Sequence, residues 1–215
     1  MSRYTHILFD HDGVLVNTEP LYFRATQECV ADLGVDLRLG DYLAMMAEGK
    51  NAWELARRSG ANESAIDQAR YRRNSRYREL LNSEPIDIEG VDEVLAELSR
   101  CYRIAIVTTA LREDFELIHR GRDIVSNVDF VLTRDAYSNS KPHPDPYLAA
   151  LDRFRISPEV ALAVEDSQRG LTAAIAAGLD CVVVHNEFTT TQDLSQATYH
   201  IDHLKDLLPH VLRQR

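Results

Sequence analysis

The sequence predicts an α/β fold: a doubly wound parallel sheet core with an inserted all-helical cap domain. Short apolar, β-branched runs alternate with amphipathic helical patterns over residues 1–16 and 90–215. Residues 17–89 contain no comparable run and have helical patterns instead. We therefore expect a core domain built from the two outer segments and a cap domain built from residues 17–89.

Five runs fit buried parallel strands, and three helical patterns lie between them. The strands are expected at residues 6–10, 104–109, 130–133, 161–165 and 181–185, and the helices at residues 91–100, 146–154 and 167–177. Ser167 is the expected N-cap of the last helix, and Gly178 follows its end. This order predicts a Rossmann-like sheet, in which ligands bind beyond the carboxyl ends of the strands.

The predicted cap contains helices over residues 21–33, 41–59 and 64–81, with a return hinge at 85–90. A glycine break at residues 47–51 interrupts the second helical pattern. Five arginines cluster on the third: Arg70, Arg72, Arg73, Arg76 and Arg78. A solvated helix face explains such a run, and electrostatic guidance of an anionic substrate is the alternative.

The composition excludes several classes of protein. A formal net charge of -10 over 215 residues argues against general nucleic-acid binding. No stretch approaches the roughly 20 apolar residues of a membrane span, and the first residues lack a secretory pattern. Three widely separated cysteines fit reduced thiols, so we expect a cytoplasmic protein. The sequence does not specify an oligomeric state.

Asp10 and Asp12 follow the first predicted strand and precede Gly13. On an extended strand, residues i and i+2 project to the same side, so both carboxylates should leave the strand together. Such a pair raises the pKa of one member or requires a cation, for which Mg²⁺ is the expected ion. One aspartate could attack an electrophile while the other transfers a proton, although a polar turn alone would also explain the pair. We expect His11 to point away from the pair and to pack in the core.

Polar side chains also follow the other predicted strands. Thr108 and Thr109 end the second strand, Lys141 lies in a proline-rich loop after the third, and Glu165 and Asp166 end the fourth. Each has an ordinary structural explanation when taken alone. Together they predict one pocket in which hydroxyls and a lysine bind a phosphoryl group, while Mg²⁺ offsets repulsion from the carboxylates.

Four stretches resemble the haloacid dehalogenase superfamily, in particular its helical-cap phosphatases and β-phosphoglucomutase-like enzymes. They are FDHDGVLVNTE, IAIVTTA, SKPHPDPYLAAL and VEDSQRGLTAAIAAGL. The resemblance implies Mg²⁺-dependent phosphoryl transfer through an aspartyl-phosphate on Asp10, with Asp12 as the general acid and base. The family's dehalogenases generally lack the second aspartate, so Asp12 favours phosphoryl chemistry.

The same resemblance implies roles for the other residues. Thr108 and Lys141 would hold the phosphoryl group. Asp166 would ligate Mg²⁺ together with Asp10 and the backbone carbonyl of Asp12, and Glu165 would support that site.

In related proteins, substrate choice resides largely in a loop of the cap, for which Gly49 and Lys50 are the local candidates. Lys50 could contact a second anionic or hydroxyl group of the substrate, or it could be a solvated loop lysine. A phosphatase acting on a small phosphorylated metabolite, such as a sugar phosphate, is favoured. A β-phosphoglucomutase-like mutase is the main alternative, and a phosphonatase using Lys50 is a further one. A binding protein that kept the fold without turnover would not need the intact set of acids and Lys141.

Overall fold

The structure is a computed structural model that describes residues 3–208. It divides into two compact units. The sheet unit comprises Met1–Asn17 and Asp87–Arg215, and the helical unit comprises Thr18–Ile86. No helix within residues 3–208 is both long enough and apolar enough to cross a membrane.

The sheet unit is built on a six-stranded sheet in the order β3-β2-β1-β4-β5-β6, and every neighbouring pair is parallel. This order confirms the predicted α/β class. The strands are β1 (His6–Phe9), β2 (Arg103–Val107), β3 (Phe130–Leu132), β4 (Ala161–Glu165), β5 (Asp180–Val184) and β6 (Tyr199–Ile201).

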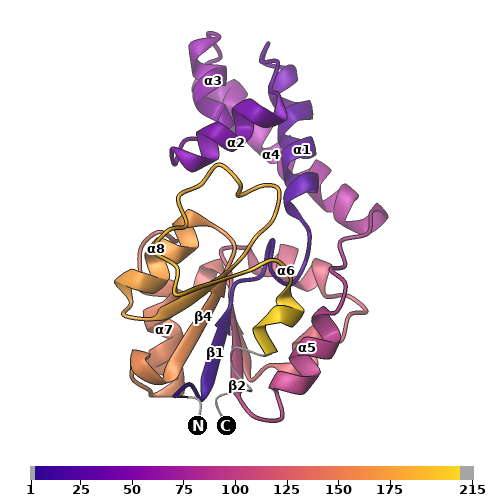
Figure 1. The fold of residues 1–215 in the computed structure, drawn as a ribbon. Coiled ribbons are helices and arrows are strands. Elements are labelled where there is room, and N and C mark those ends of the chain that lie inside the picture. The colour runs from indigo at the N-terminus through magenta and orange to yellow at the C-terminus, as the bar shows by residue number, and fades with distance from the viewer. Residues whose placement is uncertain (1–2, 209–215) are drawn as a thin grey trace. The chain divides into compact units, whose positions relative to one another are not determined.

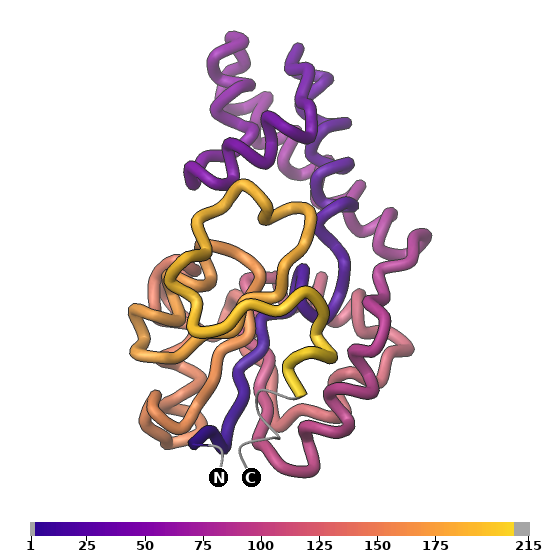
Figure 2. The backbone as a smooth tube through the Cα atoms, in the orientation of Figure 1, coloured from indigo at the N-terminus to yellow at the C-terminus, as the bar shows by residue number. Residues whose placement is uncertain are grey.

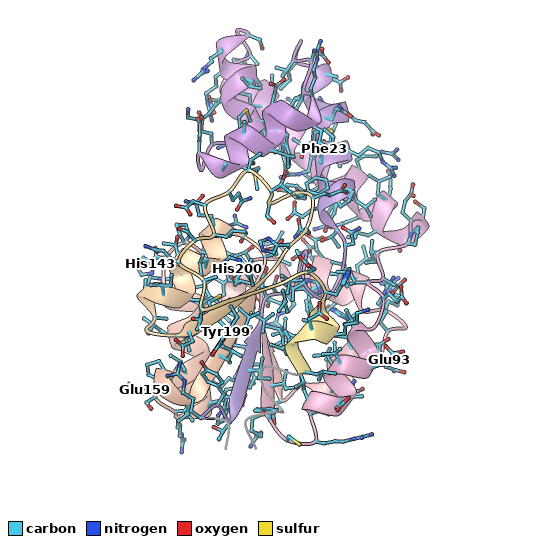
Figure 3. The ribbon with its side chains drawn as sticks, in the orientation of Figure 1. Phe23, Glu93, His143, Glu159, Tyr199 and His200 are labelled. Carbon is cyan, nitrogen blue, oxygen red and sulfur yellow. The ribbon has the colours of Figure 1, made fainter. Side chains whose placement is uncertain are left out.

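The sequence did not predict β6. It has only three residues, and a loop of mostly polar residues, 185–198, separates it from β5 (Figure 2). His200, labelled in Figure 3, lies on this strand and is exposed, so β6 lacks the continuous apolar pattern that identified the other strands.

Helices cover both faces of the sheet (Figure 1). One face carries α7 (Asp145–Phe154) and α8 (Gln168–Ala176), and the other carries α5 (Val91–Leu98) and α6 (Arg112–Ile118). Within residues 3–208, this unit also contains four 3-10 turns: Ile124–Asn127, Arg134–Ala136, Pro158–Val160 and Leu204–Asp206. The buried cluster under α7 and α8 includes Leu8, Val107, Tyr147, Leu151, Ala163, Leu171 and Val183.

Helix α8 begins and ends as the sequence predicts. The Ser167 hydroxyl accepts a hydrogen bond from the Gly170 amide at 3.2 Å, and Gly178 has a φ of 81° just past the end. Gly170 also permits close packing on β4. A Cβ atom at this position would lie 1.9 Å from the carboxyl carbon of Glu165.

The helical unit contains α1 (Glu19–Ala31), α2 (Leu39–Ala47), α3 (Ala52–Arg58) and α4 (Glu63–Ser83). The pattern expected over residues 41–59 forms two helices, because the chain turns at Gly49 with a φ of 69°. Phe23 of α1, labelled in Figure 3, packs against Tyr42 with ring centroids 5.0 Å apart.

Acidic partners balance much of the arginine run on α4. Arg76 donates to Glu28 at 2.7 Å and to Glu79 at 3.0 Å. Arg72 pairs with Asp32 at 3.4 Å. These pairs favour the solvated helix face over a surface that guides anions.

We expect Gly170→Ala to destabilise the protein by about 1–3 kcal/mol, because the added methyl group overlaps a carboxylate that is fixed in place. Gly40→Ala is the matched control. It lies in α2 with nothing within 4 Å of the added Cβ, so it should be neutral or slightly stabilising. Urea unfolding of both variants measures the difference, and equal stabilities would contradict the close packing at Gly170.

Candidate active site

Several of the predicted site residues lie at the carboxyl ends of three adjacent strands. Asp10 directly follows β1, Thr108 directly follows β2, and Glu165 is the last residue of β4. Because the order β2-β1-β4 makes these strands neighbours, their ends lie side by side. The backbone amide of Asp10 donates to Val164 of β4 at 2.8 Å, which fixes the nucleophile candidate to the neighbouring strand.

Lys141 lies at the centre of this site, with its side chain only 2% exposed. Its ammonium group has three protons, and the structure provides three acceptors. Nζ donates to Asp10 Oδ1 at 2.6 Å, to Glu165 Oε1 at 2.7 Å and to the Val107 carbonyl at 2.9 Å. The three hydrogen bonds of the lysine therefore link the carboxyl ends of β1, β2 and β4.

Glu165 is fully buried. Its Oε1 accepts from Lys141 and also from the hydroxyl of Tyr147 at 2.6 Å. The sequence analysis missed Tyr147, which looked like one of several apolar positions of α7. The Asp166 amide and the Ser167 hydroxyl donate to the other Glu165 oxygen, Oε2, each at 3.4 Å. Because both oxygens are bonded, Glu165 is held in place and in turn fixes the lysine.

Asp166 follows Glu165 and is 4% exposed. Its Oδ2 accepts from the side-chain amide of Asn186 at 2.8 Å, a residue just beyond β5 that the sequence analysis also missed. Gly13 leaves room for this carboxylate. A Cβ atom there would lie 2.1 Å from Asp166 Oδ2, and Gly13 has a φ of 80°. The glycine after the aspartate pair is therefore required for two independent reasons.

Three of these acids form a potential cation site. Asp10, Glu165 and Asp166 each offer a carboxylate oxygen, and the three oxygens lie within 4.8 Å of one another. Hard oxygen ligands of this kind suit a divalent cation such as Mg²⁺. One lysine does not neutralise three carboxylates, so the charge of the cluster also fits a bound cation.

Asp12 is held at one oxygen by two donors. Its Oδ2 accepts from His11 Nδ1 at 3.1 Å and from the Thr108 hydroxyl at 3.3 Å. The expectation that His11 points away from the aspartates is wrong: it is fully buried, as expected, but its ring turns back to Asp12. Thr108 makes this contact, whereas Thr109, the other predicted hydroxyl, lies one residue further along and is half-buried.

The electrostatics of the cluster oppose charge on Asp10. Burial, followed by the Glu165 carboxylate, raises the pKa of Asp10 to about 6, although Lys141 acts in the opposite direction. Burial alone would lower the pKa of Lys141. The facing carboxylates of Asp10 and Glu165 outweigh burial and raise that pKa, so the lysine stays charged.

Comparison with known proteins is consistent with this geometry. The family model for haloacid dehalogenase-like hydrolases matches residues 7–184, most of the chain and all of the residues of the acid cluster. The chain belongs to this family. It is therefore a hydrolase of the haloacid dehalogenase type, and the family resemblance inferred from the sequence is confirmed.

Several relatives of this hydrolase match over nearly the whole chain. Protein CbbY of Cereibacter sphaeroides is 32% identical, covering 94% of this chain and 93% of the relative. The fructose-1-phosphate phosphatase YqaB of Escherichia coli is 30% identical, and the match covers 85% of this chain and 97% of the relative. A crystal structure of a CbbY mutant from Rhodobacter sphaeroides, in complex with Xylulose-(1,5)bisphosphate, has a TM-score of 0.78 at 30% identity and covers 93% of this chain and 94% of that chain.

The predicted specificity residues of this haloacid dehalogenase-like hydrolase, Gly49 and Lys50, belong to the helical unit rather than to the unit that contains the acids. Lys50 pairs with Glu48 in its own loop, and its side chain is 47% exposed. Lys50 is therefore a solvated loop lysine in this structure, and its contact with a substrate stays a prediction.

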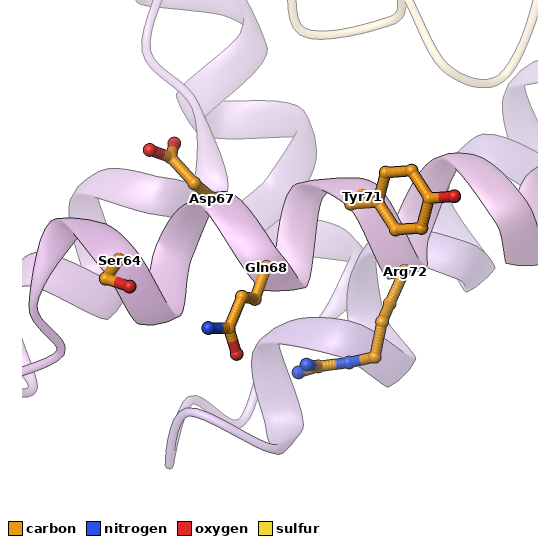
Figure 4. A pocket seen from close by; sticks show the side chains of 5 residues that line it. All are labelled: Ser64, Asp67, Gln68, Tyr71 and Arg72. Atoms are coloured by element: carbon orange, nitrogen blue, oxygen red, sulfur yellow. The ribbon is translucent and has the colours of Figure 1, made fainter.

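The helical unit also has a shallow depression of about 700 Å³ (Figure 4). Its lining residues all come from α4: Ser64, Asp67, Gln68, Tyr71 and Arg72. Asp67 is paired with Arg70, and Tyr71 is 76% exposed. These side chains do not bring a nucleophile together with a general base. The acid cluster is therefore the better candidate for the site of reaction.

The raised pKa of Asp10 predicts a stability effect. Between its unfolded value of 3.8 and its folded value of about 6, the folded state binds more protons, so ionisation destabilises the fold at higher pH. With a chelator at about pH 8, we expect Asp10→Asn to be more stable than the parent by about 1–3 kcal/mol. Below about pH 4 the difference should vanish, because the parent aspartate is then neutral as well.

Denaturant unfolding at both pH values measures this effect. Added Mg²⁺ should reduce the difference at high pH, because an ion bound to the folded parent stabilises it. A parent that is more stable than Asp10→Asn at both pH values would contradict the electrostatic description of the cluster.

Proposed function

We propose that this hydrolase is a Mg²⁺-dependent phosphatase of small phosphorylated carbohydrates, acting through an aspartyl-phosphate on Asp10. The observation that carries the proposal is the pairing of Asp10 with a buried, charged Lys141, while Asp12 is held separately by His11 and Thr108. The two aspartates therefore have different surroundings, as a nucleophile and a proton-transfer group require.

Asp10, Asp166 and the backbone carbonyl of Asp12 would hold Mg²⁺. We assign Glu165 a supporting role, because its Oε1 already accepts from Lys141 and Tyr147. When bound, the ion supplies positive charge that offsets repulsion between the phosphoryl oxygens and the carboxylates. The space that Gly13 leaves beside Asp166 supports this assignment.

In the first step, the carboxylate of Asp10 attacks phosphorus, and the bond between phosphorus and the ester oxygen breaks. Asp12 donates a proton to the departing oxygen, so the product leaves as an alcohol. Lys141, fixed by Glu165, neutralises negative charge beside the nucleophile. It would bind a phosphoryl oxygen in exchange for one of its present acceptors, since all three of its protons are already donated. We place Thr108 at the edge of the phosphoryl site, where its hydroxyl donates to Asp12.

In the second step, water attacks the phosphorus of the aspartyl-phosphate. Asp12, now ionised, takes a proton from that water, and the bond between phosphorus and Asp10 breaks. Inorganic phosphate leaves and both aspartates return to their starting states. Each step therefore balances with Asp12 acting first as an acid and then as a base.

The relatives support the substrate class. YqaB is named for fructose 1-phosphate, and the CbbY mutant was crystallised with Xylulose-(1,5)bisphosphate. Both compounds are phosphorylated sugars. We propose that Gly49 and Lys50 of the helical unit recognise the sugar or a second phosphate, since an ammonium on a glycine-containing loop suits either group.

Phosphate release from p-nitrophenyl phosphate tests the chemistry. We expect activity that depends on Mg²⁺ and falls by at least about 10³-fold in Asp10→Asn, because the proposed covalent intermediate forms on the Asp10 carboxylate. Asp152→Asn, an exposed aspartate on α7, is the matched control and should retain full activity. An Asp10→Asn variant as active as the parent would sink the proposal.

A panel of sugar phosphates, read for free phosphate and for isomerised sugar phosphate, tests the substrate. Lys50→Ala should lower kcat/KM on the best sugar phosphate by about tenfold more than on p-nitrophenyl phosphate, which lacks the groups that Lys50 would recognise. Lys205→Ala, an exposed lysine of the sheet unit, is the control. Equal effects of Lys50→Ala on both substrates would remove its specificity role, and isomer without net phosphate release would indicate a mutase.

A further inference from the structure

Two histidines, His11 and His119, form a hydrogen-bonded pair next to Asp12, and Phe115 packs against both rings. His11 Nδ1 contacts Asp12 Oδ2 at 3.1 Å, and His11 Nε2 contacts His119 Nε2 at 2.8 Å. His119 follows the end of α6, more than 100 residues further along the chain. Phe115 packs against both rings, with centroids 4.9 Å from His11 and 4.3 Å from His119.

The contacts assign the proton that faces Asp12. An ionised Asp12 can only accept a hydrogen bond, so His11 Nδ1 must donate to it. The second hydrogen bond joins His11 Nε2 to His119 Nε2 and holds the other side of the His11 ring. His119 Nδ1 is buried with no hydrogen-bond partner among residues 3–208, which favours the neutral ring. Burial, with His11 next, lowers the pKa of His119 to about 3 and acts in the same direction.

Two donors, His11 and Thr108, fix one oxygen of the Asp12 carboxylate. Oδ2 has two lone-pair directions in the carboxylate plane, and His11 and Thr108 each donate to it. Two donors on Oδ2 favour Oδ1 as the oxygen that carries the transferred proton. A rotation of the carboxylate would exchange the two oxygens and break both hydrogen bonds.

We propose that His119 and His11 form a positioning pair that holds the Asp12 carboxylate so that Oδ1 transfers the proton. This inference rests on the proposed function of Asp12. The hydrogen bond of His119 goes to His11, so His119 acts on the orientation of Asp12 through His11. Its effect should therefore appear wherever proton donation to the leaving oxygen limits the reaction.

Two aryl phosphates of nearly equal size separate this role from folding. p-Nitrophenolate leaves readily without a proton, whereas phenolate is more basic and gains more from a general acid. In His119→Phe, which keeps an aromatic ring but removes the hydrogen-bonding nitrogen, we expect the ratio of kcat/KM for p-nitrophenyl phosphate to that for phenyl phosphate to rise about tenfold. His119→Gln, whose amide can donate to His11, should restore the ratio toward that of the parent.

Phe115→Leu is the matched control, since it removes ring packing and leaves the hydrogen bonds in place. Its ratio should equal that of the parent, whatever its melting temperature. If His119→Phe does not fold, His119→Asn, whose side chain is too short to reach His11, replaces it. An unchanged kcat/KM ratio in whichever of His119→Phe and His119→Asn folds would contradict the positioning role. An equal rise of that ratio in Phe115→Leu would contradict it as well.

The same experiment separates the two claims. A parent that hydrolyses neither aryl phosphate with Mg²⁺, or an Asp10→Asn variant that is fully active, overturns the proposed function and this inference with it. Activity in the parent with an unaltered ratio in the histidine variants overturns the positioning pair alone.

Discussion

The arrangement of the site depends on one buried ammonium group, that of Lys141. The ammonium of Lys141 is enclosed by two carboxylates and a carbonyl from three adjacent strands, and all three of its protons are bonded. Removing the lysine from such a buried cluster typically costs about 3–5 kcal/mol, since the two facing carboxylates are left without compensation. The lysine therefore constrains where Asp10 and Glu165 can lie. The arrangement also places its positive charge where a phosphoryl group would bring negative charge.

Two glycines let the backbone accept this crowding. Gly13 and Gly170 each lie so close to a carboxylate, those of Asp166 and Glu165, that any side chain would overlap it. The path of the chain thus brings the acids close together. Burial, followed by the Glu165 carboxylate, raises the pKa of Asp10. Such strain is common where function requires like charges to lie close together. A bound divalent cation would relieve it and return the nucleophile to its ionised state.

Much of this site could be predicted from the sequence because its members stand at fixed places relative to strands. Asp10, Thr108 and Glu165 end buried apolar runs, and parallel strands bring their ends together. Tyr147 and Asn186 could not be found in this way. Their patterns are those of a core helix position and an ordinary loop, and only distance reveals their bonds to Glu165 and Asp166. The error at His11 has the same origin, since strand alternation does not describe a side chain beyond the end of the strand.

The covalent intermediate on Asp10 is the central claim. Borohydride reduction during turnover of p-nitrophenyl phosphate converts an aspartyl-phosphate to homoserine, which peptide mass spectrometry assigns to a position. We predict homoserine at position 10, formed only with substrate and Mg²⁺ and absent from Asp10→Asn. Homoserine at another aspartate, or none at all while the enzyme turns over, would contradict the account.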